Sequence, residues 1–137
     1  MPRRRLTRYP PLLRLWVLPL LALACGEGPE RNAADVPAPP PPPTPAEHVE
    51  GESLFAANCV VCHGQHARGT ALGPPLVHIV YEPNHHSDAA FYYAASNGVV
   101  QHHWRFGNMP PQPQVPREAM TRIIGYVRWL QRDAGID

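Results

Sequence analysis

The sequence Cys59-Val60-Val61-Cys62-His63 carries the most specific chemistry in this chain of 137 residues. A Cys-x-x-Cys pair alone fits a thioredoxin-like dithiol, half of a zinc site or a redox disulfide. A thioredoxin-like dithiol needs an α/β pattern around it, which the sequence does not show. A zinc site needs further cysteine or histidine ligands at suitable spacing, and no cysteine follows Cys62. The histidine directly after the second cysteine is therefore the informative residue.

Cys-x-x-Cys-His is the attachment signal for c-type haem. Two thiols at this spacing add to the two vinyl groups on one edge of the macrocycle, and the next residue then lies under the iron. The motif therefore predicts one covalent haem c held by Cys59 and Cys62, with His63 as the proximal iron ligand.

The residues before the motif predict a helix. Residues 47–58 are good helix formers with a few apolar positions. Gly51 lies among them and costs a helix about 1 kcal/mol relative to alanine, so we expect it to mark a close contact with another helix. Residues 63–82 hold four glycines or prolines near their centre and are predicted to form a loop.

Two more helices are predicted after this loop. Ser87 is a favourable N-cap for residues 88–96, and Asn97-Gly98 is a stop signal. Four prolines exclude regular structure over residues 110–116, and Pro116 suits the first turn of a final helix. That helix has the clearest apolar face, formed by Met120, Ile123, Ile124, Val127 and Leu130. No segment alternates with period two for long enough to propose a sheet, so the predicted class is all-α.

These features together resemble the class I c-type cytochromes, which are monohaem electron carriers, over residues 47–130. The matching segments are the helix over residues 51–59, Gly73-Pro74-Pro75-Leu76, Gly107-Asn108-Met109-Pro110 and the helix over residues 124–130. The resemblance implies a cytochrome c-like fold, with three to five short helices and loops around one haem c. It also implies that the last helix crosses the first, with Tyr126 or Val127 against Gly51 and Phe55.

The resemblance also assigns roles to single residues. Met109 would be the distal iron ligand, and the carbonyl of Pro74 would accept a hydrogen bond from His63 Nδ1–H. Met120 is expected in the core. A thioether ligand favours ferrous iron relative to imidazole, so Met109 predicts a relatively high reduction potential. The rival distal ligands are histidines: His66, His78, His85, His86, His102 and His103.

Residues 101–109 depart from the generic pattern of the family. Trp104 and Arg105 could each donate a hydrogen bond to a haem propionate, or Trp104 could simply wall the haem pocket. The pairs His85-His86 and His102-His103 raise a second idea, a copper or other metal site near the haem edge. The alternative is that these histidines face solvent, cap a helix, or bond a propionate or a backbone carbonyl.

The N-terminus predicts export. A basic stretch with four arginines precedes an apolar run of ten residues, 15–24, which is too short to span a bilayer. Residues 21–25 resemble the lipobox of bacterial lipoproteins, which implies acylation of Cys25. Ordinary cleavage after residue 24 is the alternative. The prediction is a lipid-anchored protein on the periplasmic side of a bacterial membrane. The outer membrane is favoured because Gly26 replaces the aspartate that favours inner-membrane retention.

The chain thus divides into three parts. Residues 1–24 are the lipoprotein-type signal peptide, residues 25–45 are the lipidated Cys25 with a proline-rich flexible linker, and residues 46–137 are the cytochrome c domain. The three cysteines are then all used, two on haem and one on lipid.

The charge distribution argues against nucleic-acid binding. The chain has 12 arginines, no lysine and 11 acids, but five arginines lie in the signal, which leaves a balance of −4 after residue 24. We expect a monomeric one-electron carrier, not an enzyme, which docks redox partner proteins in the periplasm or on the membrane and feeds a respiratory or reductase chain. The alternatives are a haem-based peroxidase or ligand sensor with a labile distal ligand, and a metal-binding lipoprotein that uses its histidine pairs.

Overall fold

The computed structural model describes residues 39–137. Their elements in chain order are η2 (Ala46–His48), α1 (Val49–Asn58), α2 (Val60–His63), η3 (Gln65–Ala67), η4 (Ile79–Tyr81), α3 (Asp88–Asn97) and α4 (Arg117–Asp133). Among these residues the only strand-like pairing is one antiparallel bridge between Val99 and Met109, so the all-α class is confirmed. The predicted signal, Cys25 and most of the predicted linker lie outside the described residues.

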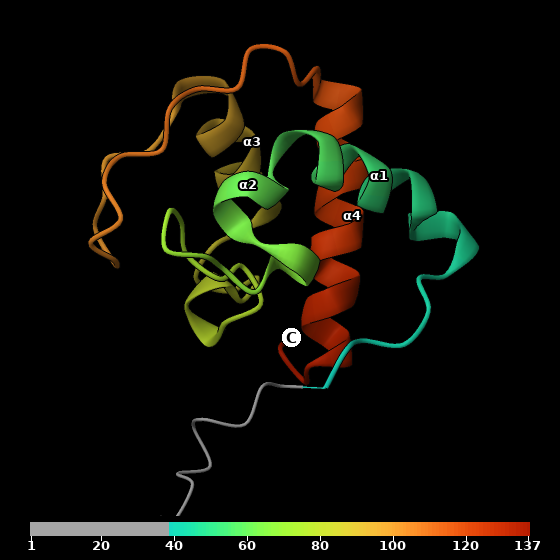
Figure 1. Ribbon diagram of the computed structural model, residues 1–137. Coiled ribbons are helices and arrows are strands. Elements are labelled where there is room, and N and C mark those ends of the chain that lie inside the picture. The colour runs from blue at the N-terminus through green and yellow to red at the C-terminus, as the bar shows by residue number, and fades with distance from the viewer. Residues whose placement is uncertain (1–38) are drawn as a thin grey trace, which may run out of the picture. The chain divides into compact units, whose positions relative to one another are not determined.

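The packing of α1 on α4 organises the fold, and Figure 1 shows the two helices crossing. At the crossing, a Cβ added to Gly51 would lie 2.2 Å from the carbonyl oxygen of Arg122, so only glycine fits there. One turn further along α1, the ring of Phe55 packs against that of Tyr126 with centroids 5.7 Å apart. The expected helix contact through Gly51, Phe55 and Tyr126 is confirmed.

The apolar face predicted for the last helix forms the centre of the core. Its five apolar residues are all buried, and Tyr126 extends the same face. Phe55 from α1 and Phe91 from α3 complete the cluster with the smaller side chains Ala67 and Ala95. Through this stripe α4 contacts both α1 and α3.

Three local details differ from the sequence-based expectation. Residues 60–63 form the short helix α2, where no helix was predicted. Ser87 occupies the N-cap of α3, but its side chain makes no capping hydrogen bond. Pro116 is the N-cap of α4 rather than part of its first turn, because its ψ of 160° is extended and the helix begins at Arg117.

Gly98 ends α3 and starts the segment that leads to Met109. Its φ of 75° lies in the left-handed region, and a Cβ there would lie 2.5 Å from the carbonyl oxygen of Met109. The next residue, Val99, exchanges two backbone hydrogen bonds with Met109, at 2.9 and 3.0 Å. This bridge closes residues 100–108 into what we term the distal loop.

Among the described helices, none is both long and apolar enough to cross a membrane.

Candidate cofactor site

A cavity of about 940 Å³ lies among α1, α3, α4 and the distal loop. Its volume is near the upper end of the roughly 300–1,000 Å³ typical of cofactor and ligand sites. Its walls are mostly apolar and include Phe55, Leu76, Phe91, Val99, Ile123 and Val127. Cys59 and His63 line this cavity together with Met109, which lies 46 positions after His63 in the sequence.

His63 is fixed in one orientation by its neighbour in the following loop. Its Nδ1 lies 2.9 Å from the carbonyl oxygen of Pro74, the same pair that the sequence resemblance names. When Nδ1–H donates to this carbonyl, the lone pair remains on Nε2, which is then the atom able to bind a metal. Burial lowers the pKa of His63, against the effect of the hydrogen bond to Pro74, and so favours the neutral, metal-binding imidazole.

The two cysteines of the motif have different surroundings. Cys59 is half-buried and lines the cavity, whereas Cys62 is exposed and is not among the lining residues. Burial, with a smaller contribution from Cys62, raises the pKa of Cys59 to about 11. A thioether carries no charge, so the burial that penalises the Cys59 thiolate does not penalise its product with a haem vinyl group.

The loop after the motif packs directly onto it. A Cβ added to Gly73 would lie 2.9 Å from the carbonyl oxygen of Cys62, so a larger residue would push the loop away. Thr70 Oγ1 donates to the same carbonyl oxygen at 2.7 Å. Together these contacts hold Pro74 where its carbonyl reaches His63.

The distal candidates separate into two groups. Met109 is half-buried, lines the cavity and is held through its backbone by the bridge to Val99. Met120 also lines the cavity, but it is buried in α4 and belongs to the core, as expected. Of the rival histidines, three line the cavity and three do not: His86, His102 and His103 do, and His66, His78 and His85 do not.

The three lining histidines are engaged mainly with one another and with backbone carbonyls. His102 Nδ1 lies 2.9 Å from the carbonyl oxygen of Val100, and the centroids of the His102 and His103 rings are 4.3 Å apart. Desolvation lowers the pKa of His86 and of His103, and the neighbouring imidazoles act in the same direction. For His86 the hydrogen bond to the carbonyl of Val80 opposes this lowering of the pKa.

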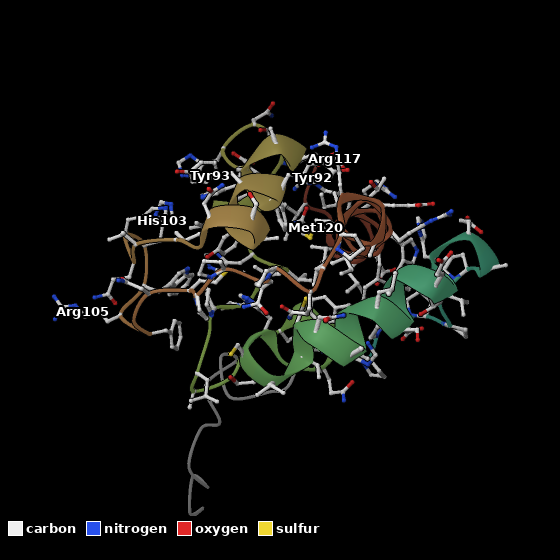
Figure 2. All side chains as sticks on the ribbon, turned by 90° about the horizontal axis from the view of Figure 1, so that it is seen from above. Tyr92, Tyr93, His103, Arg105, Arg117 and Met120 are labelled. Carbon is white, nitrogen blue, oxygen red and sulfur yellow. The ribbon has the colours of Figure 1, made fainter. Side chains whose placement is uncertain are left out.

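Trp104 and Arg105 are neighbours with opposite placements. Trp104 lines the cavity, and its indole nitrogen is buried without a hydrogen-bond partner. The Tyr81 hydroxyl is close by: burial raises the pKa of Tyr81 and the nearby Trp104 opposes this, but no hydrogen bond of normal geometry joins the two side chains. Arg105 is exposed and absent from the lining, and Figure 2 shows it pointing outward from the end of the distal loop. The structure therefore gives no support to a propionate contact by Arg105.

Arg128 is the residue of this region that sequence reasoning missed. It is 7% exposed and donates to the carbonyl oxygens of Tyr81 and His86, to Gln131 Oε1 and to Asp88. These bonds brace the segment between η4 and α3, which supplies part of the cavity wall. The sequence did contain a signal for a buried arginine: Arg128 lies one turn after Ile124, on the otherwise apolar face of the last helix.

The chain matches the family model for cytochrome c over residues 48–131. It belongs to the cytochrome c family. No solved structure matches the chain. Members of this family carry covalently attached haem c with its iron, and this cytochrome c is accordingly a haem-based electron carrier.

The residues of this cytochrome c fit that cofactor. The cavity is large and apolar, and it is lined by a cysteine and a histidine of the attachment motif. The buried N–H of Trp104 lacks an acceptor, which a propionate carboxylate can supply. Cys59 and Cys62 would hold haem c covalently, with His63 binding its iron.

Proposed function

We propose that this cytochrome c transfers single electrons through a haem whose iron is bound by His63 and Met109. The observation that carries the proposal is that both side chains line one cavity although they are 46 positions apart. A haem c bound there supplies a reversible one-electron couple between ferric and ferrous iron.

The protein's own residues serve this function by holding the two proposed iron ligands in place and by limiting the access of water. The carbonyl of Pro74 fixes the His63 ring, and the bridge with Val99 fixes the backbone of Met109. The apolar walls limit the access of water, and Trp104 N–H is the group that we assign to a propionate. If His63 and Met109 both bound the iron, no coordination site would stay open for a substrate, which favours an electron carrier over a peroxidase or sensor.

The proposal includes a location. The basic and apolar segments before residue 25, followed by a lipobox-like cysteine, support export and acylation of Cys25. The carrier would then act on the periplasmic side of a membrane and exchange electrons with redox partner proteins on or near that surface. The absence of lysine and a charge of −2 from Ala46 onward favour apolar or mixed-charge docking with modest salt dependence.

The test is an optical and redox comparison of the protein matured with haem c, using Met109→Leu and the matched variant Met120→Leu. Both exchanges replace a thioether that lines the cavity with a side chain of similar volume. We expect the wild type and Met120→Leu to show a low-spin spectrum with the weak far-red band of methionine on ferric iron. Met109→Leu should lose that band and have a lower reduction potential.

Other results would contradict the assignment. If Met109→Leu keeps the far-red band, Met109 is not the ligand, and loss of the band in Met120→Leu would transfer the role to Met120. A bis-histidine or high-spin spectrum in the wild type would likewise overturn the ligation proposed here. Haem that separates from the protein on denaturation would contradict attachment through Cys59 and Cys62.

A further inference from the structure

Two adjacent histidines and a third from a distant part of the sequence meet beside the cofactor cavity. His85 and His86 lie in the segment before α3, and His103 lies in the distal loop, where Figure 2 labels it. Each offers one ring nitrogen such that all three nitrogens lie within 4.8 Å of one another. We call these residues the histidine cluster. None of the three is needed for the haem attachment described above.

The nitrogen positions in the histidine cluster suit a metal ion. His85 Nε2 lies 3.4 Å from His103 Nε2. Two nitrogens that bind one tetrahedral ion at ~2.0–2.1 Å lie ~3.3–3.4 Å apart, so this pair already has the spacing of two ligands. His85 and His103 are exposed, so small side-chain rotations can bring the third nitrogen to the same spacing.

The third ligand is oriented by backbone. His86 Nδ1 lies 2.6 Å from the carbonyl oxygen of Val80, so Nδ1–H donates to that carbonyl and Nε2 keeps its lone pair. A histidine that donates its second ring N–H to a carbonyl is the usual arrangement of a metal-bound imidazole. The guanidinium of Arg128 in turn donates to the backbone oxygen of His86. The His86 ring is therefore already oriented before any ion binds.

From this geometry we propose that the histidine cluster binds one divalent cation of the Cu²⁺ and Zn²⁺ class through His85, His86 and His103. Neutral imidazole is a preferred ligand of both ions, and no cysteine or carboxylate belongs to the cluster. The bound ion would join the segment before α3 to the distal loop, which also carries Trp104. The site rests on the proposed function in one respect, that Met109 and not His103 binds the haem iron.

The plain alternative is a hydrogen bond between two neutral rings. At 3.4 Å, His85 Nε2–H could simply donate to His103 Nε2, and the cluster would then bind no ion specifically. Affinity and stoichiometry separate the two cases, because a hydrogen-bonded ring pair predicts neither a defined stoichiometry nor a common loss of affinity in single variants.

The experiment is calorimetric titration of the untagged, haem-loaded protein with ZnCl₂ and, separately, with CuSO₄. We expect one equivalent of ion to bind the wild type. His85→Gln and His103→Gln should each weaken binding by more than ~10-fold, since the loss of a residue that only orients a ligand already costs 10–100-fold. His48→Gln is the matched control, because His48 packs against Trp129, away from the cluster, and its replacement should leave affinity unchanged.

A second readout guards against misfolded variants. Zn²⁺ should raise the midpoint of thermal unfolding of the wild type and His48→Gln, but not that of His85→Gln or His103→Gln. Equal affinity in His85→Gln and the wild type would overturn the proposal, as would no binding in the wild type or an equal loss in His48→Gln. Failure of the Met109 assignment would appear separately, in the optical spectrum of the wild type without added metal.

Discussion

Arg128 shows how one buried side chain can organise the wall of a cofactor cavity. Its guanidinium satisfies two backbone carbonyls, of Tyr81 and His86, that lie where no helix or sheet provides a partner. It also pairs with Asp88 at 2.8 Å and lies over the ring of Phe91. The segment that carries two members of the histidine cluster is therefore positioned by α4 through Arg128, and Gln131 of the same helix supports it by donating to the carbonyl of Tyr81 at 3.0 Å.

Replacing this side chain should be costly. In Arg128→Met the aliphatic part of the side chain is kept, but the carbonyl of His86 and Gln131 Oε1 lose their donor, and the carbonyl of Tyr81 keeps only Gln131 Nε2. Because buried polar groups without partners cost ~1–3 kcal/mol each, we expect the free energy of unfolding to fall by ~2–4 kcal/mol. Denaturant unfolding of the haem-loaded protein measures this change.

The matched control is Arg122→Met on the same helix. Arg122 pairs with Glu50 at 3.5 Å, but the two side chains are 49% and 65% exposed. An exposed ion pair of this kind contributes less than ~1 kcal/mol, so the control should change stability little. Equal losses in the two variants would mean that the network around Arg128 is not the cause.

At the scale of elements, the crossing of α1 and α4 depends on the absence of one side chain. Gly51 meets the backbone of α4, which cannot move aside as a flexible side chain would. Gly125, which lies within α4, is different: a Cβ there would have only the His48 ring within 4 Å, at 3.7 Å or more. A methyl group would therefore be obstructed at Gly51 but accommodated at Gly125.

Exchanging each glycine for alanine should give effects of opposite sign. Gly51→Ala should destabilise the protein by ~1–3 kcal/mol, since overpacking exceeds the gain in helix propensity. Gly125→Ala should stabilise it by up to ~1 kcal/mol, because alanine favours the helix and meets no obstacle. Thermal or denaturant unfolding of the two variants gives the comparison, and destabilisation of similar size in both would contradict this account.

Features that depend on a short stretch of sequence were predictable, whereas features that depend on contacts between distant segments were not. The helix carrying Met120 to Leu130 was predictable because its apolar period is contained within its own sequence. The close helix contact at Gly51 was predictable because a glycine lowers helix stability and is therefore expected only where a larger side chain does not fit. The histidine cluster was predictable only as two adjacent pairs, since His85 and His103 are 18 positions apart and meet only through the path of α3 and the irregular segments on either side of it. The outward direction of Arg105 depends on the path of the distal loop, which no sequence period specifies.

For the whole molecule, the distribution of charge and proline supports the proposed division into a membrane anchor and a working domain. Five of the 12 arginines lie in the first 14 residues, and eight of the 19 prolines lie between Gly26 and Pro45. An extended proline-rich segment spans ~3.1 Å per residue, so these 20 residues could reach ~60 Å. A domain held by such a tether meets partners on the same membrane at an effective concentration in the ~mM range.

This arrangement predicts that the anchor can be removed without loss of the cofactor. In the full-length chain with Cys25→Ser, we expect the protein to move from the membrane fraction to the soluble fraction while its haem stays covalently bound through Cys59 and Cys62. Cell fractionation followed by haem staining of the denatured protein measures both properties. The wild type should be released from the membrane only by detergent, since salt does not extract an acyl chain.

The kinetic consequence of the tether is a separate readout of the same variant. Reduction of the carrier by membrane-bound donors should slow once Cys25→Ser lowers its local concentration, and purified variant added back at ~mM concentration should restore the rate. If the variant remains on the membrane after a high-salt wash, a surface other than Cys25 holds it there. If it is released but reduced at the wild-type rate, the tether does not serve electron transfer on that membrane.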